Sequence, residues 1–275
     1  MTGAKKPKND PLPPPPPTHK PKANKTGDFR DALSLYIEHP ETNPEGRIVE
    51  YDDEFVVIND KFPKSSYASH SRPTNPQRAS DLTFPRVHLL LLPRDPKIYY
   101  QHPLQYLSAN PAFLAKVRTR VQRLKALAAS ELRRQYGAQS ASDAPYQTAL
   151  ETLMSSDDPP PPEARDALLP PGRDWSREIV AGVHTHPSMN HMHIHVLSRE
   201  HNSPRLISKK HYLSFNTSFL VTMEDFPLEE GSLRFRPGNW PNWDLKCWRC
   251  GMNFQNKMAA LVRHLEGEIE EWKKE

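Results

Sequence analysis

The chain has little cysteine and no long apolar run. Its 275 residues include only Cys247 and Cys250, and two cysteines with two residues between them exclude a disulfide framework. The longest uncharged apolar stretch, Leu89–Leu92, is far shorter than the about 20 residues that cross a bilayer. The first residues lead into lysines instead of an apolar secretory segment. We therefore expect a soluble intracellular protein without a membrane span.

Glycine is scarce and proline abundant, with 10 and 30 residues respectively, and the prolines are clustered. Eighteen of them lie in residues 1–27, 66–86 and 138–176, and the rest of the chain still suffices for a sizeable core. Residues 1–27 carry six lysines and one aspartate, whereas the other 248 residues have a net charge of −1. We expect this tail to be disordered. A basic arm fits nucleic acid or a nuclear-import receptor, and a merely solubilising tail fits its composition equally well.

Hydrophobic periodicity predicts a mixture of helices and strands. Apolar residues at steps of three and four predict helices over 29–38, 112–136 and 258–272. Short apolar or alternating runs predict strands over 48–51, 55–58, 87–92, 179–184 and 191–198. Residues 66–86 and 138–176 are polar or proline-rich and read as two insertions.

Histidines alternate with apolar residues over one short segment, which comprises His191, Met192, His193, Ile194, His195 and Val196. Alternate side chains of a β-strand share a face, so the three imidazoles are expected on one side and the apolar side chains in a core. A desolvated imidazole without a partner costs about 1–3 kcal/mol, which indicates a polar ligand at this face. A metal site on the strand and accidental clustering are the alternatives.

The segment from His191 to Leu197 resembles the histidine-triad superfamily, whose pattern is His-φ-His-φ-His-φ-φ with φ apolar. Residues 57–63 and 87–93 look like the two nucleotide-cradling strands of that family, interrupted by the insertion at 66–86. Ser188 falls where the family has a phosphate-contacting serine. The resemblance implies an α+β fold, with an antiparallel sheet and flanking helices, and nucleotidyl transfer.

The resemblance also implies a role for each residue of the site. His193 would attack the α-phosphorus of a nucleotide and form a covalent nucleotidyl-imidazole, which water then hydrolyses. His191 and His195 would orient the attacking ring or bind non-bridging oxygens. His88 would complete the cluster, and Asp60 would accept the ribose hydroxyls.

Cys247 and Cys250 begin a second pattern, Cys-x2-Cys-x13-His-x3-Glu, which continues to His264 and Glu268. This spacing is close to that of a ββα zinc finger with glutamate as the fourth ligand, and it predicts one structural zinc ion per chain. The neighbouring Glu266 and Glu270 leave the fourth ligand open. A redox-active Cys-x-x-Cys is the alternative, but no thioredoxin-like context surrounds it.

A histidine-triad strand followed by such a finger resembles the aprataxin family, in particular its fungal-type forms with a Cys-Cys-His-Glu site. Further matching segments lie at 183–184, 187–189, 203–204, 208–212 and 214–217, and Lys64 resembles the family's phosphate-contacting lysine. The resemblance covers about 29–65, 87–135 and 178–275. It departs at both insertions and at the N-terminal phosphopeptide-binding domain of animal members, so recruitment through such a domain is not expected.

The aprataxin resemblance implies a phosphoric-anhydride hydrolase of DNA repair. Its substrate would be nicked or double-stranded DNA with AMP joined to the 5′ end, its products AMP and a 5′-phosphate, and its location the nucleus. Lys64 and His184 would neutralise the departing phosphate, and the finger helix with Lys209, Lys210 and His211 would hold DNA phosphates. Ordinary surface charge is the alternative for these basic residues.

The same resemblance organises the chain into a tail at 1–27, a catalytic domain at 28–215 and a finger domain at 216–275, acting as a monomer. Two other functions compete with this interpretation. One is a general histidine-triad hydrolase of dinucleotides or AMP-amine substrates with a purely structural finger. The other is a non-catalytic zinc-finger protein that binds DNA.

Overall fold

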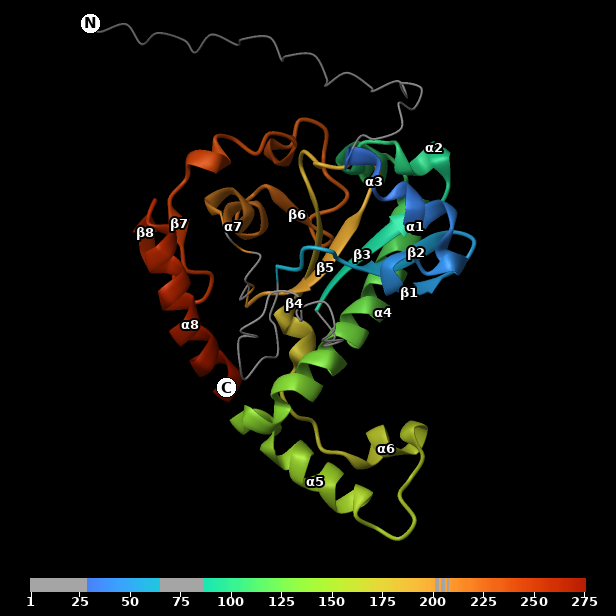
Figure 1. The fold of residues 1–275 in the computed structure, drawn as a ribbon, viewed down its shortest axis with the longest axis vertical. Coiled ribbons are helices and arrows are strands. Elements are labelled where there is room, and N and C mark those ends of the chain that lie inside the picture. The colour runs from blue at the N-terminus through green and yellow to red at the C-terminus, as the bar shows by residue number, and fades with distance from the viewer. Residues whose placement is uncertain (1–28, 65–86, 201–202, 204–205, 207) are drawn as a thin grey trace, which may run out of the picture.

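The computed structural model describes residues 29–64, 87–200, 203, 206 and 208–275 (Figure 1). The predicted tail at 1–27, the insertion at 66–86 and Pro204 of the matching segments lie outside the described residues. Within the described residues, no helix combines the length and apolar character that crossing a bilayer requires.

Six strands form one antiparallel sheet in the order β1-β2-β3-β5-β4-β6, and two short strands pair separately. Their bounds are β1 Ile48–Tyr51, β2 Phe55–Asn59, β3 His88–Pro93, β4 Ile179–His184, β5 Ile194–Ser198, β6 Leu220–Thr222, β7 Leu245–Lys246 and β8 Asn253–Gln255. The sheet confirms the predicted antiparallel α+β class.

In the described part of the chain, eight α-helices surround the sheet or extend from it (Figure 1). They are α1 Ser34–Glu38, α2 Pro96–Tyr99, α3 Pro103–Ala109, α4 Pro111–Tyr136, α5 Ala144–Met154, α6 Pro162–Leu168, α7 Lys209–Asn216 and α8 Met258–Lys274. The helix predicted over 29–38 divides into a 3-10 turn, Phe29–Asp31, and α1. The segment 138–176, expected only as a proline-rich insertion, contains α5 and α6.

The two faces of the sheet pack against different helices. Odd-numbered apolar residues of β2 and β3, such as Val57 and Leu91, join the core that α4 covers, together with Ile194 and Val196 of β5. Even-numbered residues such as Leu90 face the smaller core made with α1. Because side chains alternate along strands, the histidines of β3, β4 and β5 lie on the sheet face opposite α4.

The basic face of α4 is already neutralised. Its Lys116, Arg120 and Arg123 form ion pairs with carboxylates of the β1–β2 hairpin, namely Glu54, Asp52 and Glu50. These cations therefore stabilise a surface helix–hairpin contact, and a DNA-binding surface has to be sought on other elements.

The C-terminal helix α8 belongs to two cores. Leu261 and Leu265 pack with α7 and β7 in a small core of their own. One to two turns later, Ile269 and Trp272 pack into the main core beside α4. The segment predicted as a finger domain is thus continuous with the sheet domain through the last turns of α8, and the boundary at residue 215 stays a prediction.

Candidate active site and metal centre

Four imidazoles meet at one place on the sheet. They come from β3 (His88), the end of β4 (His184), β5 (His195) and the residue just before β5 (His193). Ring centroids lie 5.3 Å apart for His88 and His195, 4.6 Å for His184 and His195, and 4.9 Å for His193 and His195. The sequence pattern did not predict the fifth ring at this site, that of Phe215 in α7, which packs against His88, His184 and His195.

His191 lies in a different environment from the other histidines. Strand β5 begins at Ile194, so the strand predicted from residue 191 is three residues too long and its alternation does not extend to His191. The ring of His191 packs beside Tyr99 and Tyr100, and its Nε2 lies 3.2 Å from the Ser34 hydroxyl. The part of His191 that reaches the cluster is its carbonyl oxygen, 2.8 Å from Nδ1 of His193.

Hydrogen bonds define which ring nitrogens carry protons. The carbonyl of His191 accepts only, so Nδ1 of His193 donates and its Nε2 keeps a lone pair. The backbone N–H of Lys64 donates to Nδ1 of His88 at 3.1 Å, which places the His88 proton on Nε2. That Nε2 lies 3.0 Å from Nδ1 of His195, so His195 accepts there and presents an N–H at Nε2.

Several buried nitrogens of the site hydrogen-bond to no group in the described part of the chain. They are Nε2 of His184, Nε2 of His195 and Nδ1 of His191. A buried polar atom without a partner costs about 1–3 kcal/mol, so native sites rarely keep one without a ligand. Two of these atoms belong to the four-histidine cluster, and the N–H at Nε2 of His195 could donate to an oxygen of a phosphoryl group.

Burial keeps the cluster uncharged near neutral pH. Desolvation lowers the pKa of His88 to about 4 and that of His184 to about 3, from the usual 6.5. It lowers the pKa of His193 as well, and that of His195 well below the usual value. A neutral His193 is the form whose Nε2 can act as a nucleophile.

The depressed pKa values predict loss of stability in mild acid. Because the pKa of His88 is about 4 when folded and 6.5 when exposed, the unfolded chain binds more protons between these values. The free energy of unfolding should therefore fall as the pH drops below 6.5, by about 2 kcal/mol at pH 5 from this residue alone. Urea unfolding of the wild type and His88→Gln at pH 7 and 5 measures the difference. An equal fall in the free energy of unfolding of both proteins would contradict the prediction. Any loss of metal at low pH would affect both proteins alike and so would not produce a difference between them.

Other predicted residues border the cluster to different degrees. Asp60 Oδ2 lies 3.4 Å from Nδ1 of His88, and its other oxygen accepts from the Phe62 N–H at 2.8 Å. The Lys64 side chain is buried, and its ammonium donates to the Phe62 carbonyl. Ser188 is exposed, and the contact described for it joins its carbonyl oxygen to Arg30. The structure thus places Asp60 and Lys64 beside the histidines and Ser188 at the surface.

The predicted basic run forms the first turn of α7. Ser208 caps this helix by accepting from the His211 N–H, and Lys210 and His211 are exposed. The Lys209 ammonium donates to the side chain of Asn256, next to the start of α8. Lys257, exposed just beyond Asn256, therefore joins this basic surface. Lys257 is not among the predicted DNA-binding residues, although its place directly before the finger helix is a signal in the sequence.

Cys247, Cys250, His264 and Glu268 bring one donor atom each to within 4.8 Å of all the others. Cys250 Sγ lies 3.1 Å from His264 Nε2, which lies 3.2 Å from Glu268 Oε1. Two thiolates, an imidazole and a carboxylate at such spacings fit tetrahedral zinc. Arg249 bonds the second oxygen of Glu268 at 2.7 Å and so leaves Oε1 for a metal ion.

The group includes Glu268, whereas the other candidates for the fourth ligand, Glu266 and Glu270, are exposed and outside it. Helix geometry gives the reason, because residues four apart lie on one face, and Glu268 follows His264 by four positions. The helix geometry therefore favours Glu268 as the fourth ligand over Glu266 and Glu270.

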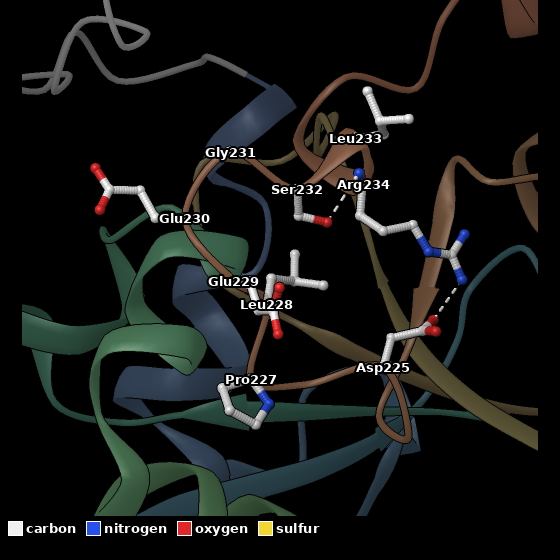
Figure 2. Close-up of a pocket in the computed structure, with 9 residues that line it drawn as sticks. All are labelled: Asp225, Pro227, Leu228, Glu229, Glu230, Gly231, Ser232, Leu233 and Arg234. Atoms are coloured by element: carbon white, nitrogen blue, oxygen red, sulfur yellow. Dashed lines mark hydrogen bonds and ion pairs between the residues drawn. The ribbon is translucent and has the colours of Figure 1, made fainter.

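A separate hollow of about 530 Å³ lies in the loop after β6 (Figure 2). Asp225 and Arg234 form an ion pair at its edge, 2.6 Å apart, and Glu229 and Glu230 are exposed beside it. The residues lining it are Asp225, Pro227, Leu228, Glu229, Glu230, Gly231, Ser232, Leu233 and Arg234. None of the predicted site residues is among them, and no nucleophile is paired there with a base, so the histidine cluster remains the candidate active site.

Comparison with family models finds two matches. Residues 216–271 match the C2HE / C2H2 / C2HC zinc-binding finger, and residues 166–211 match the scavenger mRNA decapping enzyme C-term binding family. The first match spans the metal group. The second spans His184 and the triad segment up to His195.

Curated relatives match most of the chain. The aprataxin-like protein of Schizosaccharomyces pombe is 30% identical over 253 residues, which cover 92% of this chain and 86% of that protein. The aprataxin-like protein of Saccharomyces cerevisiae is 31% identical over 246 residues, covering 88% and 96%.

Solved structures give the same result. The aprataxin orthologue Hnt3 in complex with DNA superposes with a TM-score of 0.60 at 29% identity, over 89% of this chain and 96% of that one. A structure of Hnt3 from Schizosaccharomyces pombe gives a TM-score of 0.60 over 89% and 94%. With identity of 30% or more spread over nearly the whole length, and with the triad site and the Cys-Cys-His-Glu group both in place, this chain belongs to the aprataxin-like family.

Proposed function

We propose that the chain hydrolyses 5′-adenylated DNA and releases AMP and a 5′-phosphate end. One observation carries this proposal: His193 has an unprotonated Nε2 beside the buried, unpartnered Nε2 atoms of His184 and His195. That arrangement offers a nucleophile next to the His195 N–H, which can donate to a phosphoryl oxygen. The relatives add the substrate class, because solved Hnt3 structures include complexes with DNA and with DNA and guanosine.

The chemistry follows from the ring nitrogens. The Nε2 lone pair of His193 attacks the α-phosphorus, and the bond from phosphorus to the oxygen bridging to the DNA phosphate breaks. The positive charge that forms on the ring is stabilised by the Nδ1–H···O=C bond to His191. His195 Nε2–H donates to a non-bridging oxygen. A water molecule then attacks phosphorus, which releases AMP and regenerates the imidazole.

The remaining residues bind the two ends of the substrate in this proposal. The leaving group is a phosphate monoester, which is stable as an anion and needs little acid catalysis. Lys64 neutralises it, His184 borders it as an uncharged ring, Asp60 accepts the ribose hydroxyls and Ser188 contacts the phosphate. The position of Asp60 and Lys64 beside His88 supports their part of the assignment.

Helix α7 supports a link between catalysis and DNA binding. Its first turn carries Lys209 and Lys210, and Phe215 near its end packs on the histidine rings. Six residues of helix span about 9 Å, so DNA phosphates bound at the first turn would lie close to the cluster. We include His211 and Lys257 in the same DNA-binding surface.

The finger is proposed to hold one structural zinc ion through Cys247, Cys250, His264 and Glu268. Bound zinc would cross-link the β7–β8 hairpin to α8 and thereby present Lys257 with a defined geometry. A DNA substrate and the basic arm at residues 1–27 also support a nuclear protein, and we propose that it acts as a monomer.

Substrate choice tests the proposal. Turnover of an adenylated nicked duplex should exceed that of a diadenosine polyphosphate, because only the duplex engages α7 and the finger. A preference for the small molecule would instead indicate a general histidine-triad hydrolase. Brief quenching without acid should also trap AMP on His193.

Charge reversal on the basic surface should weaken DNA binding without changing chemistry. We expect Lys210→Glu and Lys257→Glu each to lower affinity for the duplex about tenfold and to reduce the salt dependence by about one phosphate contact. Anisotropy titrations at two salt concentrations measure both effects. Lys274→Glu, at the far end of α8 and paired with Glu271, is the matched control and should bind as the wild type does. Equal weakening by all three variants would reject a localised surface.

A further inference from the structure

We propose that Arg173, in the segment 138–176, is a positioning residue. It holds α8 and the finger in a fixed position relative to the histidine-bearing strands. The proposal rests on the proposed function, since it assumes that the finger helps to hold DNA. Arg173 does not touch the histidine cluster. It acts through the last turns of α8 and through the residue that precedes β4.

Arg173 is a buried cation enclosed by two indole rings. Only 8% of the residue is exposed, and its guanidinium carbon lies 4.3 Å from the Trp175 ring centroid and 4.9 Å from that of Trp272. Its Nη1 also donates to the backbone carbonyl of Trp272 at 2.5 Å. The same guanidinium therefore contacts both the ring and the main chain of one residue of α8.

Glu178 extends this contact to the catalytic strands. One of its carboxylate oxygens accepts from Arg173 at 3.0 Å and the other from the Trp272 indole N–H at 3.0 Å. Glu178 directly precedes β4, which ends at His184. Its carbonyl accepts from the Arg199 N–H just after β5, which carries His195. The end of α8 is thus linked through Glu178 to two of the three strands that carry the cluster, β4 and β5.

A second buried group holds Arg173 itself in place. Asp143 is fully buried and accepts from the Arg173 N–H at 2.6 Å, the Trp175 indole at 2.8 Å and Arg133 of α4 at 3.2 Å. A Cβ on Gly172 would lie 2.0 Å from an Asp143 oxygen, so the glycine is required for this close approach. In the segment 138–176, Asp143, Gly172 and Trp175 therefore form a closely packed site for the arginine, which we call the Arg173 site.

The chemistry of the Arg173 site indicates that the arginine orients α8 and does not merely fill space. An apolar side chain would fill the space between two tryptophans without the cost of desolvating a cation. A guanidinium instead makes directional bonds, which define the axial position of α8. Since α8 has 17 residues and is about 25 Å long, a tilt of about 10° at this end would move its first turn, next to Lys257, by about 4 Å.

Kinetics on two substrates test the proposal. In Arg173→Met we expect KM for the adenylated nicked duplex to rise at least about tenfold, while kcat/KM for a diadenosine polyphosphate changes less than about twofold. Arg177→Met is the matched control, because Arg177 is 85% exposed and its ion pair within the described residues is with Asp174 of its own turn. Equal falls in kcat/KM for both substrates, or an unchanged KM for the duplex, would overturn the proposal.

Hydrogen exchange gives a readout that does not depend on the proposed function. Amides of residues 269–274 should exchange at least tenfold faster in Arg173→Met than in Arg177→Met, with zinc content unchanged. If Arg173→Met fails to fold, Trp272→Phe removes the indole bond to Glu178 and reduces the ring that Arg173 contacts, and it should show the same pattern with smaller effects. Unchanged exchange rejects the role of Arg173, whereas faster exchange in a chain inactive on adenylated DNA rejects only the proposed function.

Discussion

Replacing His193 with alanine is expected to lower AMP release from adenylated DNA by at least about 10³-fold, because it removes the proposed nucleophile that bonds to phosphorus. The ring is buried on the sheet, away from α7's exposed first turn, so affinity for the duplex should stay within about twofold of the wild type. Single-turnover release of labelled AMP and anisotropy binding measure the two quantities.

The control for this variant is another imidazole that lies outside the cluster. His39→Ala removes a side chain that is 60% exposed and paired with Glu41, and it should retain full activity. AMP release by His193→Ala that equals the wild type would show that His193 is not the nucleophile, and no AMP release by either protein would favour the non-catalytic zinc-finger interpretation. Loss of binding together with activity would indicate a folding defect, which circular dichroism detects.

Removing the proposed metal ligand Cys247 is expected to have the second large effect. Structural zinc contributes about 10–16 kcal/mol of apparent binding free energy in finger peptides, so Cys247→Ser should release the ion and unfold the β7–β8 hairpin. Elemental analysis should find about one zinc per wild-type chain and much less in the variant. Affinity for the duplex should fall at least about tenfold, while turnover of a diadenosine polyphosphate should change little.

Met252→Ser is the matched control for the zinc variant, because Met252 is exposed in the same turn and lies outside the donor group. It should keep both zinc and DNA affinity. A folded wild-type chain without zinc and with a disulfide between the two cysteines would remove the finger from the proposed function.

Patterns confined to neighbouring residues predicted much of this protein. The strands Ile48–Tyr51 and Ile179–His184 have the predicted bounds, because local periodicity determines which side chains face a core. The prediction for residues 191–198 was wrong in its first three positions. The histidine alternation continues there while the ladder pairing with β3 begins only at Ile194, and pairing depends on another strand.

The sequence by itself determined the chemistry that the chain carries: the triad segment, the Cys-x2-Cys knuckle and the helix positions of His264 and Glu268, since each depends on spacing within one turn or strand. Only the tertiary structure decided which imidazole nitrogens are unprotonated and which lack a hydrogen-bond partner among the described residues. The hydrogen bond that sets the His195 tautomer joins residues 107 positions apart, and the one from Arg173 to Trp272 joins residues 99 apart. Protonation and burial are properties of contacts between distant segments, and those contacts exist only once the chain has folded.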